Sequence, residues 1–388
     1  MELNHNITEW RTLTLDDLTL KIGSGITPTG GSTVYKSEGR PFVRSQNIGW
    51  GNLKLSEIVF IEEIIHQTFP NTEIHLNDVF LNISGASIGR SSIANEFLVG
   101  GNVNQHVCII RPNPNYLDSV FLRSYLLSEF GQKQIDSFQS GGNREGLNIG
   151  QIKIFQIFLP PLKEQKAIAN ALSDADVYIS SLEELIQKKQ NIKQAAMQKL
   201  LKPKKDWEVK TLGEVVDVLD NLRVPLNDNQ RNLMKGDIPY CGANGIVDYV
   251  DDFVIDDEII LIAEDGGYFD EYKNRPIAYK MAGKCWVNNH AHILKAKVDF
   301  SQDYLFYSIV NKNILNFIVG GTRAKLNKSS LLKIEIFTPP TLEEQTQIAT
   351  ILSDMDNELE ILEEKLQKAE QLKQGMMQNL LTGKIRLL

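Results

Sequence analysis

Residues 160–201 read PPLKEQKAIANALSDADVYISSLEELIQKKQNIKQAAMQKLL, and residues 339–381 read PPTLEEQTQIATILSDMDNELEILEEKLQKAEQLKQGMMQNLL. From Gln165 and Gln345 onward the two stretches align without a gap, and about half of the positions are identical. An internal repeat of this length decides the fold, because it fixes the number and kind of structural units in the chain.

Each copy has the apolar spacing of a long helix. The apolar positions recur in alternating steps of four and three residues, at Ile168, Leu172, Ala175, Ile179, Leu182 and Ile186 in the first copy and at Ile348, Leu352, Met355, Leu359, Leu362 and Leu366 in the second. This spacing predicts a narrow apolar stripe, so we expect the two helices to pack on each other along a seam. At 1.5 Å per residue each helix spans roughly 55 Å.

Proline and glycine mark the ends of both predicted helices. Each helix begins after a double proline, and Thr341 with Glu344 predicts a capping box for the second helix. The first helix is expected to end before Pro203 and the second near Gly383.

The duplication extends into the segments that precede the helices. Short stretches match in the same order, namely Trp10, Thr14, Leu15 and Asp17 with Trp207, Thr211, Leu212 and Glu214; 39–42 with 237–240; 104–107 with 288–291; and 141–148 with 320–327. The chain therefore reads as two tandem units, each followed by its own helix. We expect one unit at 1–158, its helix at 159–201, a linker at 202–206, a second unit at 207–337, and the second helix with a tail at 338–388.

Within each unit the pattern indicates an α+β fold. Apolar runs at 79–83, 107–110, 259–262 and 292–294 predict strands, and 118–130 and 301–316 predict amphipathic helices. Loops rich in Gly, Asn and Ser separate them, and Asn244-Gly245 predicts a hairpin turn. The two units differ most in these loops, which suggests one scaffold that presents two different binding surfaces.

The composition of the whole chain narrows the class of protein. The net charge is −8 and no segment is strongly basic, which argues against strong nucleic-acid binding by the chain alone. The three cysteines, Cys108, Cys241 and Cys285, lie far apart and indicate a reducing cytoplasm rather than disulfides or zinc. No secretory signal or stretch of about 18 apolar residues is visible, so we expect a cytoplasmic protein without a membrane span.

Three motifs that carry chemistry elsewhere are better explained as local structure. Gly85-Ala86-Ser87-Ile88-Gly89 fits a hydrolase elbow but lacks the helix that should follow, so it predicts a turn. The segment 113–116, Asn-Pro-Asn-Tyr, lacks one proline of a methyltransferase box and predicts a turn that opens the helix at Asp118. His290 and His292 have no third ligand at usable spacing, which favours hydrogen bonding over a metal site.

The remaining candidates are polar loop residues that can contact DNA. Arg pairs with guanine and Asn or Gln with adenine; the residues of suitable type are Arg44, Gln46, Asn47, Arg90, Arg144, Asn244, Lys273, Arg323 and Lys325. Arg144 and Arg323 each follow a double glycine, where backbone can approach DNA closely, and suit phosphate contacts shared by both units.

The order of these parts resembles the specificity subunit of type I restriction–modification systems. The resemblance rests on two variable units, two like helices that contain Glu-Gln and Ile-Ala, and the closing LLTGKIRL at 380–387, with GDIPYCGANGI at 236–246 and NNHAHIL at 288–294 in agreement. It implies two target-recognition domains that each read half of a bipartite, asymmetric site in double-stranded DNA, and an antiparallel helix pair that spaces them with pseudo-twofold symmetry.

The resemblance also implies partners. The helices would dock two modification subunits, which bind S-adenosylmethionine and methylate adenine, and restriction subunits would add ATP- and Mg-dependent cleavage. The chain itself would hold no cofactor or metal and would not be an enzyme. Two alternatives remain: a self-sufficient DNA methyltransferase or hydrolase that uses the Ser87 or Asn113 region, and a coiled-coil scaffold that binds only protein.

Overall fold

A computed structural model describes residues 9–139, 146–320 and 324–387, and its internal contacts divide the chain into two units. Unit 1 comprises Met1–Glu183 and Lys365–Leu388, and unit 2 comprises Glu184–Glu364. Because this division cuts through both long helices, each unit contains one half of each helix. The domain boundaries expected from the sequence stay a prediction.

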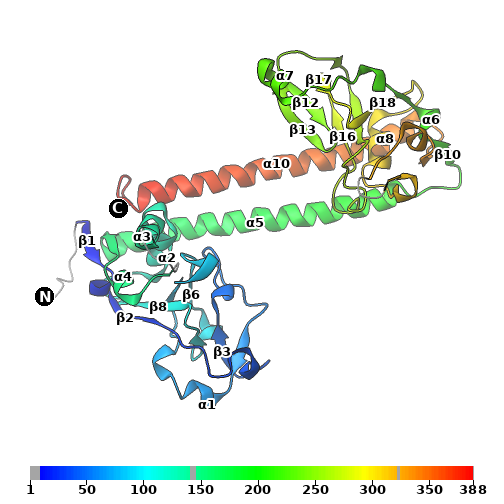
Figure 1. Ribbon diagram of the computed structural model, residues 1–388. Coiled ribbons are helices and arrows are strands. Elements are labelled where there is room, and N and C mark those ends of the chain that lie inside the picture. Colours follow the sequence, from blue (N-terminus) through cyan, green and yellow to red (C-terminus); the bar gives the residue numbers. More distant parts are fainter. Residues whose placement is uncertain (1–8, 140–145, 321–323, 388) are drawn as a thin grey trace. The chain divides into compact units, whose positions relative to one another are not determined.

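The two repeated stretches form the long helices α5 (Leu162–Leu200) and α10 (Leu342–Leu380), each of 39 residues. The helices pack together in antiparallel orientation (Figure 1), with ion pairs from Lys373 to Asp176 in unit 1 and from Lys193 to Asp356 in unit 2. Seam residues such as Leu172 are buried. The predicted pair of antiparallel helices is therefore confirmed.

The start of α10 differs from the predicted capping box. The Thr341 hydroxyl accepts the Glu344 backbone N–H at 3.2 Å, as a cap requires. The Glu344 carboxylate, however, accepts from Lys204 Nζ at 2.6 Å and from the Trp207 indole N–H at 3.3 Å. Only half of the capping box forms, because a cation and an indole outside the helix occupy the carboxylate.

Unit 1 is built on three small sheets. An antiparallel sheet has the order β2-β8-β5-β6, a mixed sheet has the order β4-β3-β7, and β1 pairs with β9. The strands are β1 (Arg11–Thr14), β2 (Thr19–Ser24), β3 (Arg40–Val43), β4 (Val59–Ile61), β5 (Val79–Asn82), β6 (Ser91–Ile93), β7 (Asn102–Val103), β8 (Val107–Pro112) and β9 (Gln156–Leu159). The helices of this unit besides the long ones are α1 (Glu63–His66), α2 (Ser119–Leu127), α3 (Glu129–Gln139) and α4 (Ile149–Lys153).

The central strand β5 is buried on both faces. Val79 and Leu81 point into a core with α2, while Phe80 points into a second core with the mixed sheet. The single helix predicted at 118–130 is wrong, because α2 ends at Leu127 and α3 begins at Glu129. Ser128 is extended and its hydroxyl accepts the Gly131 N–H at 3.3 Å, so it caps a new helix.

Unit 2 repeats this plan with longer strands. The sheet orders are β11-β18-β15-β16 and β13-β12-β17-β14, and β10 pairs with β19. The strands are β10 (Glu208–Thr211), β11 (Val216–Val218), β12 (Lys235–Gly242), β13 (Gly245–Val250), β14 (Ile255–Asp256), β15 (Ile259–Ala263), β16 (Ala278–Met281), β17 (Lys284–Val287), β18 (Ala291–Ala296) and β19 (Glu335–Thr338). The helices are α6 (Leu212–Val215), α7 (Asp228–Leu233), α8 (Gln302–Ile309) and α9 (Lys328–Leu331).

Two local predictions in unit 2 have different outcomes. The hairpin predicted at Asn244-Gly245 forms between β12 and β13, but its two turn residues are Ala243 and Asn244, because Gly245 already pairs with Gly242 as the first residue of β13. The helix predicted at 301–316 ends at Ile309 instead. The Asn313 side chain accepts the Leu315 N–H at 3.1 Å, which offers the backbone an alternative to helix.

The duplication predicted from the sequence is visible in equivalent contacts. The Gln165 side-chain oxygen accepts the Asp118 N–H at 2.9 Å in unit 1, and Gln345 accepts the Ser301 N–H at 3.0 Å in unit 2. Each glutamine thus fixes the start of a domain helix, α2 or α8, to the first turn of a long helix. Within the described ranges, no helix is long and apolar enough to cross a membrane.

Candidate nucleic-acid interface

Both units contain the same Asn-x-His turn before a central strand. The Asn104 side chain accepts the His106 N–H at 3.1 Å, and Asn288 accepts the His290 N–H at 2.8 Å. The ring of each histidine then meets a side chain from the loop after β5 or β15. His290 Nδ1 lies 2.6 Å from Asp265 Oδ1, while His106 Nδ1 pairs with the Ser84 hydroxyl.

The same loops contact the segments that follow the predicted double-glycine stretches. Ser84 pairs with Gly146 in unit 1, and Asp265 pairs with Lys325 in unit 2, both in antiparallel bridges. Each unit therefore gathers two polar loops at one place, which we call its loop corner: residues 84–90 with 146–148 in unit 1, and residues 264–267 with 324–327 in unit 2.

The Ser84–His106 pair is not part of a hydrolase triad. The other ring nitrogen of His106 lies 3.0 Å from the Gln105 side-chain amide, where a triad needs a carboxylate. Gly85–Ser87 forms a short 3-10 turn with Gly85 at a φ of 73°, and strand β6 follows it. The turn expected from the sequence is therefore confirmed.

The loop corner of unit 2 is held by a network of partly buried polar and charged side chains around the buried His292. His292 Nδ1 lies 2.7 Å from Asp220 Oδ2, and its Nε2 lies 2.8 Å from the Leu326 carbonyl oxygen. Glu264 binds Arg223 at 2.5 Å and Lys325 at 2.9 Å. Both histidine ring nitrogens are engaged by protein, which supports the hydrogen-bonding role predicted for His292.

The carboxylates of this network are tuned by their partners. Burial alone would raise the pKa values of Asp220 and Glu264, but hydrogen bonds from His292 and Arg223 outweigh it and hold both pKa values below their usual range. In the part of the chain that the structure describes, no group of three His, Cys, Asp or Glu side chains could hold a metal ion.

Three predicted DNA-contacting residues of unit 1 form a turn after β3. Arg44 donates to the Glu57 carbonyl at 2.9 Å, with its guanidinium carbon 5.4 Å from the centre of the Tyr35 ring. Gln46 is exposed and lies 3.3 Å from the Glu57 carboxylate. Asn47 is buried. Its side-chain oxygen and its side-chain nitrogen each form a hydrogen bond with a backbone group. Asn47 therefore supports the turn that presents Arg44 and Gln46.

Asn82 connects this turn to Arg90. Its side-chain N–H donates to the Ser45 carbonyl at 2.9 Å, and its backbone N–H donates to the Arg90 carbonyl at 2.9 Å. Among the described residues, Asn82 Oδ1, Arg44 Nε and Arg90 Nε are buried without a hydrogen-bond partner. Sequence reasoning missed Asn82, although one polar residue within the apolar run 79–83 is a visible signal.

The predicted contacts of unit 2 fall into two groups. Asn244 is exposed and donates to the Gly266 carbonyl at 2.9 Å, so it joins Lys325 at the loop corner. Lys273 lies elsewhere, in a groove beside α5. Arg144 and Arg323 lie outside the described residues. DNA contact by all nine residues stays a prediction.

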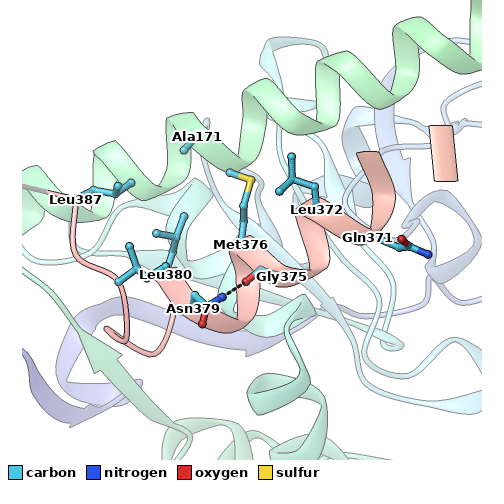
Figure 2. A pocket seen from close by; sticks show the side chains of 9 residues that line it. Ala171, Gln371, Leu372, Gly375, Met376, Asn379, Leu380 and Leu387 are labelled. Atoms are coloured by element: carbon cyan, nitrogen blue, oxygen red, sulfur yellow. Dashed lines mark hydrogen bonds between the residues drawn. The ribbon is translucent and has the colours of Figure 1, made fainter. Parts of the chain in front are cut away.

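Unit 1 has an apolar pocket of about 480 Å³ between α5 and the end of α10. Figure 2 shows Leu372 and Met376 of α10 opposite Ala171 of α5, with Leu387 of the tail nearby. The Asn379 side chain donates to the Gly375 carbonyl at 2.9 Å and is thereby occupied within the helix. This pocket offers apolar surface rather than groups that carry chemistry.

Two dissimilar loop corners on a scaffold that occurs twice in the chain are typical of a recognition protein. A family model for the type I restriction modification DNA specificity domain matches residues 7–194 and again 204–371. The chain therefore belongs to that family, as the resemblance predicted. The family is one of DNA specificity modules and not of catalytic subunits, in agreement with the prediction that the chain is not an enzyme.

Individual relatives agree with the family match. A type I restriction enzyme specificity subunit of Methanocaldococcus jannaschii is 26% identical over an alignment of 415 positions, which covers 98% of this chain and 94% of the relative. A specificity subunit of Haemophilus influenzae is 40% identical over 145 residues, but the match spans only 36% of that protein. The crystal structure of a type I restriction-modification S subunit from M. genitalium has a TM-score of 0.66 at 18% identity, with 98% of each chain covered, which supports the fold.

Proposed function

We propose that this chain gives a type I restriction–modification complex its sequence specificity. Each unit would read one half of a bipartite, asymmetric site in double-stranded DNA. The observation that carries the proposal is the pairing of one repeated scaffold with two dissimilar loop corners. A repeated scaffold serves a repeated task, while different side chains at equivalent places select different base sequences.

The loop corner of each unit and a turn next to it supply suitable side chains for this reading. In unit 1 the exposed Gln46 and the guanidinium groups of Arg44 and Arg90 can donate to base edges or phosphates. In unit 2 Asn244 and Lys325 occupy the corresponding region. Arg144 and Arg323 remain proposed phosphate contacts in the double-glycine segments of both units.

The long helices would set the distance between the half-sites and dock two modification subunits. Their repeated sequence offers the same surface twice, which suits two copies of one partner. The modification subunits would bind S-adenosylmethionine and methylate adenine. Restriction subunits would bind ATP and Mg and join through them. The chain would act in the cytoplasm and hold no cofactor of its own.

Methylome sequencing tests this function. Cells that express the chain together with its modification subunit should carry methylated adenines in one motif with two specified halves and an unread spacer. Cells that express the modification subunit alone should lack that motif. Methylation of the same motif without the chain would contradict the proposal, as would a motif without a spacer.

A further inference from the structure

Unit 2 contains a basic groove that its loop corner does not include. The groove has a volume of about 1220 Å³ and lies between the last turns of α5, one turn of α10, strand β16 and helix α8 with the residues after it. We call it the lysine groove, after the residues Lys193, Lys202, Lys273, Lys280 and Lys312 that line it. In a chain with a net charge of −8, such a gathering of cations marks a distinct surface.

Most of the positive charge in the lysine groove is uncompensated. Asp356 is the one carboxylate among the described lining residues, and it is already bound by Lys193 and by the Tyr307 hydroxyl at 2.6 Å. Lys280 pairs with Asp303 at 2.7 Å. The remaining lysines, Lys202, Lys273 and Lys312, make no ion pair within the described part of the chain.

Lys312 would gain most from an anionic partner. Its side chain is half-buried, and burial lowers its pKa, an effect that the charge of Glu335 opposes only in part. An ammonium group that loses water without gaining an acceptor destabilises the structure. An anion that enters the lysine groove would supply that acceptor.

One side of the groove is a row of amides on α5. The amides are those of Gln187, Gln190, Asn191, Gln194 and Gln198, whose helical spacing places them on one face. Among these described side chains, only Gln187 and Asn191 form a hydrogen bond, at 3.2 Å, and it is to each other. Amide and ammonium donors together are the groups that contact phosphate oxygens in protein–DNA complexes.

The apolar side chains that line the lysine groove, such as Met197 and Phe306, are only partly exposed. None of its described lining residues is an exposed large hydrophobic side chain. The pocket of unit 1 in Figure 2 has the opposite character, since Leu372 and Ile385 in its lining are 66% and 52% exposed. Protein–protein interfaces depend on exposed apolar side chains of this kind, whereas the binding of the DNA backbone depends on positive charge.

We infer that the lysine groove binds the phosphate backbone of double-stranded DNA next to the half-site of unit 2, through Lys202, Lys273 and Lys312. The inference deepens the proposed function and rests on it. These contacts hold the duplex without reading its sequence.

The salt dependence of DNA binding tests the inference directly. In the complex with modification subunits, the variant K202Q/K273Q/K312Q should show a slope of log affinity against log salt that is shallower by about 2.7, at about 0.9 per lost phosphate contact. The methylated motif should not change. The matched control K188Q/K199Q/K333Q removes the same charge from exposed lysines outside the groove and should keep the wild-type slope.

A second variant guards against a folding effect at the half-buried Lys312. K202Q/K273Q alters only the other two lysines and should reduce the slope by about 1.8. Equal slopes for wild type and both groove variants would overturn the inference while the proposed function stands. Loss of the modification subunits without a change in slope would make the groove a protein site and also overturn it. A wild-type complex that binds no duplex would contradict the proposed function itself.

Discussion

At the scale of single residues, one buried carboxylate fixes the start of α5 to the end of the chain. Glu164 accepts the Trp10 indole N–H at 3.1 Å and two hydrogen bonds from Arg386, both at 2.7 Å. Burial would raise the pKa of Glu164, but the hydrogen bonds from Arg386 and Trp10 outweigh it and lower that pKa. Glu344 holds the corresponding place at the start of α10.

The substitution Glu164→Gln should therefore destabilise unit 1 by about 2 kcal/mol at pH 7, because it removes a charged acceptor from a buried site. A carboxylate with a depressed pKa stabilises the fold at neutral pH and loses that effect as pH falls through its folded pKa. The difference between wild type and variant should shrink in acid. Urea unfolding at several pH values measures it.

Glu183→Gln is the matched control, since Glu183 is exposed on the same helix and forms no ion pair in the described ranges. Its effect should stay within about 0.5 kcal/mol. Equal losses for both variants, or a difference that grows in acid, would show that the Glu164 contacts do not stabilise unit 1.

The His292–Asp220 pair of unit 2 gives a second prediction at this scale. His292 and Asp220 lie where unit 1 has the neutral pair Cys108 and Ser24 on β8 and β2. His292→Cys alone should cost about 2 kcal/mol in unfolding free energy, because Asp220 loses a hydrogen bond and keeps only Arg223 at 3.4 Å and the Ile293 N–H at 3.2 Å.

The double variant D220S/H292C copies the pair found in unit 1 and should recover most of that loss, since a neutral pair can replace a buried ion pair at little cost. Denaturant unfolding of both single variants and the double variant gives the coupling energy between the positions. A double variant less stable than either single one would mean that the charges are needed for more than their mutual pairing.

At the scale of elements, periodicity was the reliable signal. The four-three spacing of apolar residues extends over many turns and predicted α5 and α10 correctly. The predicted bounds of the shorter helices were wrong where one polar side chain outweighed the helical pattern. Ser128 caps a new helix, and the Asn313 side chain forms a hydrogen bond with the nearby backbone. Helix propensity alone does not predict whether such a side-chain hydrogen bond will replace a helical one.

The length of the paired helices gives a prediction for the recognised DNA. Seven residues inserted between Glu183 and Glu184 and seven between Glu364 and Lys365 keep the seam in phase, since seven residues complete one heptad. Each insertion adds about 10 Å, which corresponds to about three base pairs at 3.4 Å. The unread spacer should widen accordingly, while both half-sites stay the same.

Methylome sequencing reads the spacer directly. An insertion in α5 alone is the control, because it breaks the register between the helices and should abolish methylation. If the matched insertions changed a half-site instead of the spacer, the helices would not act as the ruler.

At the scale of the whole molecule, the duplication made the architecture predictable. Equivalent residues such as Gln165 and Gln345 make the same contacts in both units. The elements of one unit can therefore be predicted from those of the other. The site was less predictable. The sequence pointed to Arg44 and Arg90, but only tertiary contacts bring them together through Asn82.

The lysine groove illustrates the same limit. Its lysines come from α5 and the residues just after it, from β16 and the segment before it, and from the residues after α8, and no spacing in the sequence links them. The net charge of the whole chain does not reveal a local cluster of lysines of this kind. Folding alone places these cations side by side.

The central claim is that the two units read their half-sites independently, and an exchange of one unit tests it most directly. Residues 10–158 would be replaced by the equivalent unit of another family member, and the methylome would be sequenced in cells that carry the modification subunit. We predict a motif in which one half-site has changed while the other half-site and the spacer remain. A change in both half-sites would contradict the claim.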